Sequence, residues 1–163
     1  MKALIKVKSI GVMTAELYPE KAPKTVENFV SLAKSGFYKD LIFHRVIEGF
    51  MIQGGGFDAG FDHKETKAIK GEFAANGFIG NDIAHTRGVL SMARTSDPNS
   101  ASSQFFVMHE NAPHLNGQYA AFGCVTDGFD VLDSIATCET GRYMYFSDVP
   151  KTAIVIEDIE IVD

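Results

Sequence analysis

The sequence has no tryptophan, only two cysteines and no long apolar run, and these shortages narrow what the protein can be. No stretch approaches the run of about 20 apolar residues that a membrane-spanning helix needs, so we expect no membrane segment. Lysines interrupt the N-terminal residues MKALIKVKSI, which lack the continuous apolar core of a secretory signal. Without tryptophan, the 13 phenylalanines must supply most of an aromatic interior.

Cysteine is too scarce for a disulfide framework. Cys124 and Cys138 do not form a CxxC pair, and each lies in a segment with periodic apolar residues. We therefore predict two reduced, buried thiols in a cytoplasmic protein.

Positive charge is also in short supply, with 15 Lys and Arg residues against 21 Asp and Glu and a formal net charge of -6. Contacts with nucleic-acid phosphates need clustered Lys and Arg, which are scattered along this chain. The composition therefore predicts no nucleic-acid partner.

What is present is the composition of a folded globular chain. Apolar residues make up 45% and charged residues 22% of the 163 residues, and no repeat or linker is visible. A chain of this length buries a sizeable core but rarely divides in two. We predict a single domain over residues 1–163.

The hydrophobic periodicity indicates mainly β structure. Alternating residues predict an antiparallel hairpin over 2–17, and helical spacing predicts helices over 23–34 and within 128–137. Residues 54–82 lack periodicity and indicate a long surface loop. About eight short strands with two helices favour a closed barrel or a sandwich. The further strand candidates are 43–53, 88–93, 102–109, 120–125 and 153–162.

The sequence contains no convincing motif for binding a nucleotide or a metal ion. The run GGGFDA at 54–59 fits a relaxed dinucleotide-binding pattern, but no helical apolar stripe follows it, so we interpret it as a turn or bulge. His109, Glu110 and His114 suggest a zinc motif, but the histidines are five residues apart and Pro113 disfavours the helix that the motif requires. No serine lies in a nucleophile-elbow context and neither cysteine has a basic neighbour, so we expect no metal site and no covalent catalysis.

The stretch FHRVIEGFMIQGGG at 43–56 places Arg45 between two apolar runs with no obvious partner. A buried charge is costly unless something satisfies it, so the residue needs an explanation. Residue statistics alone favour a surface arginine whose stem covers apolar area while its head stays in water.

Several stretches together weaken that interpretation. FHRVIEGFMIQGGGF at 43–57, GVLSMAR at 88–94, SSQFFV at 102–107 and AAFGCVTDGFDVLDSI at 120–135 closely resemble the cyclophilin family of peptidyl-prolyl cis-trans isomerases. The ending, TGRYMYFSDVPKTAIVIEDIEIV, is most similar to the small cytoplasmic bacterial members of the peptidyl-prolyl isomerase B type. The resemblance spans nearly the whole chain and implies a closed eight-stranded antiparallel β-barrel capped by two α-helices.

The resemblance also implies a peptide site on the outer face of the barrel, with no cofactor and no metal. Its catalytic set would be Arg45, Phe50, Gln53 and Phe106. Its substrate-binding set would be His44, Met51, Ala93, Arg94, Thr95, Gln104, His114, Leu115 and Tyr119.

Three positions depart from the commoner family pattern. His114 stands where tryptophan is frequent, Tyr119 where histidine is frequent, and Arg94 where asparagine is frequent. Because the tryptophan position contacts cyclosporin-type ligands in the family, the resemblance predicts weak cyclosporin binding.

The function implied is an enzyme that accelerates rotation of X-Pro peptide bonds in unfolded or flexible protein chains and so assists folding. The alternative is a non-catalytic module that binds proline-containing peptides, as a chaperone or scaffold would. Intact Arg45, Phe50, Gln53 and Phe106 favour the enzyme, since a pure binder does not need the arginine.

Overall fold

The computed structural model describes all residues from 1 to 163, which form ten strands, two α-helices and two short 3-10 helices. The predicted N-terminal hairpin and both predicted helices are confirmed. The strands are β1 Lys2–Val7, β2 Gly11–Leu17, β3 Arg45–Ile47, β4 Met51–Gly54, β5 Val89–Met92, β6 Phe105–Met108, β7 Ala121–Asp127, β8 Thr140–Tyr143, β9 Phe146–Pro150 and β10 Ile156–Val162. The helices are α1 Pro23–Lys34 and α2 Phe129–Ala136, and the 3-10 helices are η1 Ala74–Asn76 and η2 Pro113–Leu115.

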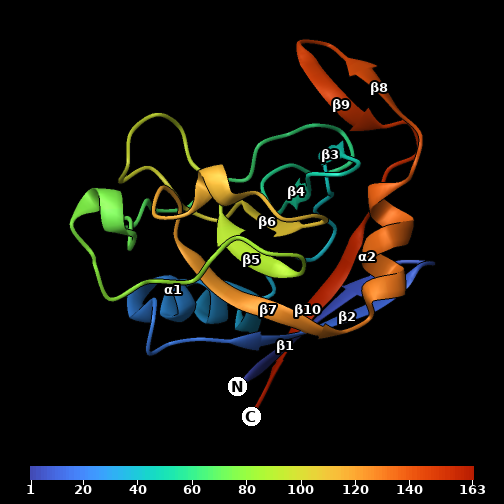
Figure 1. The fold of residues 1–163 in the computed structure, drawn as a ribbon. Helices are drawn as coiled ribbons and strands as arrows, with labels where there is room; N and C mark the ends of the chain where they lie inside the picture. The colour runs from blue at the N-terminus through green and yellow to red at the C-terminus, as the bar shows by residue number, and fades with distance from the viewer.

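Eight strands form one curled antiparallel sheet in the order β10-β1-β2-β7-β5-β6-β4-β3 (Figure 1). The ladder does not run fully around, because β3 and β10 do not pair with each other. The segment before β3 instead contacts the start of β10. The N–H of Asp40 donates to the carbonyl of Ile156 at 2.9 Å, and the N–H of Phe43 donates to the carbonyl of Ile154 at 3.0 Å. The sheet is thus an open barrel with a short bridge, and the expectation of a closed barrel was overstated.

The sheet has apolar side chains on both faces, which explains why β6 is buried at every position. Phe105 and Val107 point into a core of 31 buried residues under α1. Phe106 and Met108 point to the opposite face, where they join a smaller cluster of seven buried residues. This second cluster exists because residues 109–120, including η2, fold back over the outer face of β6 and β7. The outer cluster is the part of the fold that builds the site.

Helix α1 begins at Pro23 and ends at Lys34, and Gly36 just beyond it adopts the left-handed conformation that the sequence predicts for a helix stop. Its buried face carries Val26 and Phe29, and Phe29 packs edge-on against Phe105 at 5.5 Å between ring centroids. Ala22 provides no side-chain cap at its N-terminus. Buried Glu72 replaces that cap by accepting the backbone N–H groups of Lys24 and Thr25 at 3.2 and 2.7 Å.

The hairpin of β8 and β9 was not predicted from the sequence. It is a separate two-stranded sheet that projects from the body of the molecule (Figure 1), and Tyr143, Met144 and Tyr145 are exposed around its turn.

Both cysteines are free thiols, although each is half-buried rather than buried. None of the helices is both long and apolar enough to cross a bilayer.

Candidate active site

Arg45 and Gln53 face each other across the first two strands of the site. Residue 45 pairs with residue 53 in the antiparallel register of β3 and β4, so both side chains emerge on the same face. The Arg45 guanidinium donates to Gln53 Oε1 at 3.2 Å, and Gln53 Nε2 donates to Gln104 Oε1 at 3.0 Å. The three side chains form a hydrogen-bonded row across the mouth of the site.

Two features shape this row: Arg45 has no acidic partner, and a glycine allows Gln104 to pack closely. Arg45 is half-buried, and it takes part in none of the ion pairs in the structure, so no carboxylate neutralises its charge. Gly56 lets Gln104 lie close to the backbone, since a Cβ at Gly56 would come within 2.4 Å of Gln104 Cγ. The glycine run at 54–56 thus serves close packing, in agreement with its interpretation as a tight turn or bulge.

An apolar hollow of about 150 Å³ opens beside the guanidinium. Met51, Phe106 and Leu115 are buried in its walls, with exposed fractions of 1%, 5% and 8%, while Phe50 is half-buried at its lip. It brings together nine of the residues that the resemblance implies: Arg45, Phe50, Met51, Gln53, Ala93, Arg94, Phe106, Leu115 and Tyr119.

A second, polar hollow of about 240 Å³ lies on the other side of the glutamines. Thr95 and Gln104 line this hollow and not the apolar one, whereas Gln53, Ala93 and Arg94 line both. Sequence reasoning missed His63, Ser100 and Ser102, which also line it. Ser102 was within reach, because it belongs to the SSQFFV motif, but His63 and Ser100 lie on loops without a motif of their own.

Arg94 forms part of the wall between the two hollows. Its guanidinium lies between the rings of Phe73 and Tyr119, at 4.9 and 4.6 Å from their centroids, and donates to the backbone oxygens of Thr95 and Gln118 at 2.9 and 2.7 Å. Cation–π contacts and backbone acceptors hold the side chain in place without a carboxylate. Arg94 therefore presents a fixed positive charge where the two hollows meet.

Two of the implied substrate-binding residues lie outside both hollows. His44 is buried on the opposite side of β3, where its ring lies 4.7 Å from that of Phe57. Burial, assisted by the charge of Arg45, lowers the pKa of His44 from 6.5 to about 4, so the residue is neutral at pH 7. His114 is exposed on η2, and its ring stacks on Phe50 at 6.0 Å between centroids.

His85 supports the wall of the apolar hollow from behind. Its ring stacks on Phe106 at 6.1 Å, and its Nε2 lies 2.8 Å from Ser91 Oγ. Burial lowers the pKa of His85 from 6.5 to about 4, even though a hydrogen bond with Asn116 acts in the opposite direction. The wall therefore rests on a neutral imidazole at pH 7.

The structure groups no three His, Cys, Asp or Glu side chains in a way that would hold a metal ion. His109, considered above with Glu110 and His114, instead binds the backbone N–H of Gly49 through Nδ1 at 2.8 Å. A larger hollow of about 530 Å³ lies at the base of the β8–β9 hairpin, but it lacks a hydrogen-bonded polar row like that of Arg45.

This geometry suits non-covalent chemistry. The apolar hollow can hold a small aliphatic ring, and the guanidinium at its rim can donate a hydrogen bond to an atom next to that ring. No serine or cysteine lines the apolar hollow, so nothing there can serve as a covalent nucleophile of these types. The site can therefore bind and stabilise a strained arrangement without making or breaking bonds.

The comparisons agree with this architecture. The family model described as "Cyclophilin type peptidyl-prolyl cis-trans isomerase/CLD" matches residues 3–161. The chain is 44% identical over 160 residues to peptidyl-prolyl cis-trans isomerase B of Escherichia coli, with 93% of this chain and 94% of that protein covered. It is 46% identical over 159 residues to a peptidyl-prolyl cis-trans isomerase of Acinetobacter baylyi, with 94% and 81% covered.

A solved structure gives the same result. The crystal structure of a cyclophilin type peptidyl-prolyl cis-trans isomerase from Cryptosporidium parvum, obtained in the presence of the dipeptide Ala-Pro, matches this chain with a TM-score of 0.83. The two are 33% identical, and the match covers 100% of this chain and 99% of that one. The similarity thus extends over the whole fold.

Proposed function

The chain belongs to the cyclophilin family and is a peptidyl-prolyl cis-trans isomerase, and we propose that its reaction takes place in the apolar hollow beside Arg45. The observation that carries this proposal is the row from Arg45 through Gln53 to Gln104, which directs an unpaired guanidinium along the rim of that hollow. In this proposal Arg45 is the catalytic residue, assisted by Phe50, Gln53 and Phe106.

The barrier of the reaction comes from amide resonance. Rotation about a peptide bond costs about 18 to 20 kcal/mol, and an uncatalysed X-Pro bond takes roughly tens to hundreds of seconds to isomerise. At the twisted transition state the proline nitrogen becomes pyramidal and regains its lone pair. The Arg45 guanidinium then donates a hydrogen bond that the planar ground state cannot accept, which lowers the barrier selectively.

The other residues of the site divide into two groups. Phe50, Met51, Phe106 and Leu115 hold the pyrrolidine ring in the apolar hollow while the preceding carbonyl swings. Gln53 and Gln104 fix the guanidinium and contact the peptide backbone. The polar hollow, with Ala93 and Thr95 at its edge, receives the residues that precede proline.

The substrates that fit this site are proline-containing peptides and unfolded or flexible protein chains. Both hollows lie at the surface and share Gln53, Ala93 and Arg94 in their walls, so an extended segment can occupy them together. The match to a structure obtained with Ala-Pro supports the same ligand class. We place this activity in a single domain over residues 1–163 and in the cytoplasm, with the two free thiols as support for a reducing compartment.

An isomer-specific proteolysis assay on an X-Pro peptide tests the location of the site. We expect the protein to accelerate isomerisation, Arg45→Ala to lose most of the acceleration, and Arg142→Ala to keep it. Arg142 is the matched control, because it is an exposed arginine at the other large hollow. Full activity in Arg45→Ala, or an equal loss in Arg142→Ala, would place the reaction elsewhere, and no acceleration by the wild type would leave only peptide binding.

A further inference from the structure

The turn between β3 and β4 carries Phe50 at the lip of the apolar hollow, and one histidine holds this turn from two sides. The backbone N–H of His109 donates to the Phe50 carbonyl at 2.9 Å. Its ring nitrogen Nδ1 accepts the N–H of Gly49 at 2.8 Å. Gly49 has a φ of +80°, a conformation that other residues rarely adopt, so the turn has a defined shape that these two contacts maintain.

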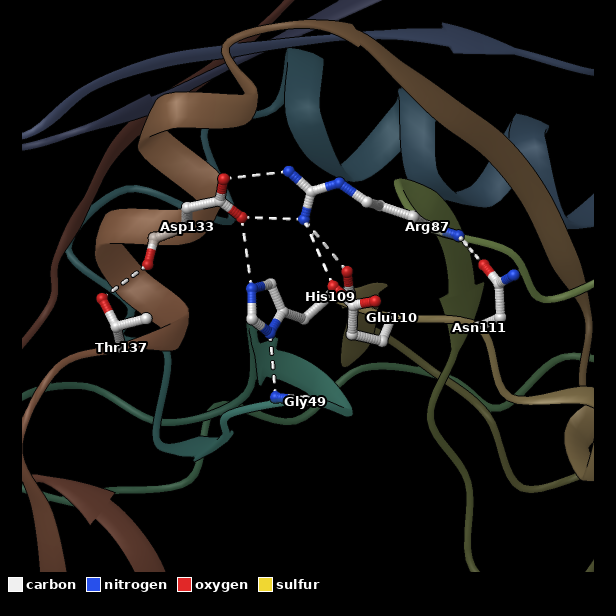
Figure 2. Close-up of polar contacts among 7 residues, drawn as sticks. All are labelled: Gly49, Arg87, His109, Glu110, Asn111, Asp133 and Thr137. Carbon is white, nitrogen blue, oxygen red and sulfur yellow. Dashed lines mark hydrogen bonds and ion pairs between the residues drawn. The ribbon is translucent and has the colours of Figure 1, made fainter.

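The Gly49 contact requires one particular state of the imidazole. Because Nδ1 accepts a hydrogen bond, the neutral ring carries its proton on Nε2. That nitrogen lies 3.2 Å from Asp133 Oδ1, on helix α2 (Figure 2). An N–H donor on Nε2 and a carboxylate acceptor on Asp133 therefore fix both the tautomer and the plane of the ring.

Asp133 is itself held in place. The guanidinium of Arg87 makes two hydrogen bonds to its carboxylate, at 2.8 and 2.9 Å, and another to the His109 carbonyl at 3.1 Å (Figure 2). Arg87 is the main reason that the pKa of Asp133 is lower than 3.8, which keeps the carboxylate charged at neutral pH. Glu110 lies 3.9 Å from the same guanidinium.

The contacts thus form one continuous path from α2 to the site. It runs from the Arg87–Asp133 pair to His109 Nε2, and from His109 Nδ1 to the Gly49 amide, one residue before Phe50. The His109 side chain is 11% exposed, so water competes little for either ring nitrogen. No residue of this path lines the apolar hollow, and the Gly49 contact reaches the hollow through the turn that carries Phe50.

We propose that His109 is a positioning residue for catalysis: its Nδ1 holds the Gly49 amide and thereby keeps Phe50 at the lip of the proline pocket, with Asp133 orienting the ring. This inference rests on the proposed function, since it needs the apolar hollow to be the proline site. Phe50 contacts the ring of bound proline in both the ground state and the transition state. Loss of the Gly49 contact should therefore weaken substrate binding and raise KM, with a smaller effect on kcat.

Two polar substitutions separate positioning from mere packing. In His109→Asn the side-chain Oδ1 takes the place of Nδ1 and can still accept the Gly49 N–H. In His109→Gln the terminal amide takes the place of Nε2, which keeps a donor for Asp133 but leaves Gly49 without an acceptor. Both variants replace the imidazole with a smaller side chain that ends in a polar amide. If His109 served only to fill space, the two variants should therefore have similar KM values.

The experiment measures kcat and KM for X-Pro isomerisation in wild type, His109→Asn and His109→Gln, together with amide hydrogen exchange at Gly49. We expect His109→Gln to raise KM about tenfold and to speed Gly49 exchange, and His109→Asn to restore both values to near those of wild type. Equal KM values in the two variants, or wild-type KM in His109→Gln, would overturn the proposal.

Arg45→Ala, measured in the same series, distinguishes a failure of the proposed role of His109 from a failure of the proposed proline site. A loss of kcat in Arg45→Ala together with an unchanged KM in His109→Gln would refute only the role of His109. An unchanged kcat in Arg45→Ala would refute the proposed site itself, and with it the basis for linking Gly49 to catalysis.

Discussion

Arg45 is oriented by one uncharged neighbour and forms no ion pair, so most of its donors stay available to a bound molecule. Gln53 is an uncharged acceptor, so the guanidinium is oriented and yet retains its full positive charge at the rim of the hollow. Lysine could not replace it well, because an ammonium is a point charge on a flexible stem and lacks the planar fork of donors. In the proposed mechanism the chemistry depends on this one charged group and on the absence of a carboxylate beside it.

Position 114 allows a prediction for a single residue. His114 is exposed and stacks on Phe50, where many cyclophilins carry tryptophan, so the surface offered to a cyclosporin-type ligand is smaller and more polar. We expect weak cyclosporin binding by the wild type and binding at least about tenfold tighter by His114→Trp. Isothermal titration calorimetry measures both. Tight binding by the wild type would contradict the role assigned to this position.

At the scale of elements, the parts that depend on local pattern were predictable. Alternation predicts β1 and β2, and the apolar spacing of Val26, Phe29 and Ala33 predicts α1. The β8–β9 hairpin was missed because its exposed tyrosines and Met144 disturb the alternation. Periodicity also gives no sign of which residues meet across the chain.

The site likewise has a part that sequence motifs reveal and a part that depends on contacts between distant residues. The motifs around Arg45 and Phe106 led to the lining of the apolar hollow through their resemblance to the cyclophilin family, and the pairing of β4 with β3 and β6 brings Arg45, Gln53 and Phe106 together. His63 and Ser100 of the polar hollow, and the path from Asp133 to Gly49, depend on how loops and α2 pack. Contacts of this kind join residues distant in sequence, and one sequence without its structure does not contain them in any local pattern.

The N-terminus of α1 gives a prediction at this scale. Glu72, with 4% of its surface exposed, accepts the N–H groups of Lys24 and Thr25 and the hydroxyl of Thr25, 47 residues away. Its removal leaves buried donors unsatisfied, so Glu72→Ala should lower the free energy of unfolding by about 1 to 3 kcal/mol. Urea denaturation measures this value.

Glu65→Ala is the control for that experiment, because the Glu65 side chain is 85% exposed and its contact with His63 is long, at 3.7 Å. It should leave the unfolding midpoint nearly unchanged. If the two alanine variants were equally stable, Glu72 would not act as the cap of α1.

For the whole molecule, two buried neutral histidines make stability depend on pH. His44 and His85 are 5% and 1% exposed, and burial lowers the pKa of each from 6.5 to about 4. The unfolded chain therefore binds protons at a higher pH than the folded one. Stability is fully present above pH 6.5 and falls as the pH decreases toward 4, by about 1.4 kcal/mol per pH unit for each histidine.

Urea denaturation between pH 7 and pH 4.5 measures this dependence. His85→Gln should reduce the slope by about half, since one of the two groups is removed. A free energy of unfolding that stays constant between pH 6.5 and pH 5 would contradict the assignment of neutral, buried imidazoles.

The central claim is that Arg45 stabilises the twisted X-Pro bond and contributes little to holding the planar peptide. Exchange spectroscopy by NMR on an X-Pro peptide tests it directly, because the same spectra report the bound fraction and the rate of cis-trans interconversion on the protein. For Arg45→Ala we predict peptide affinity within about threefold of wild type and an interconversion rate about a hundredfold lower. An unchanged rate, or a loss of affinity as large as the loss of rate, would contradict the account.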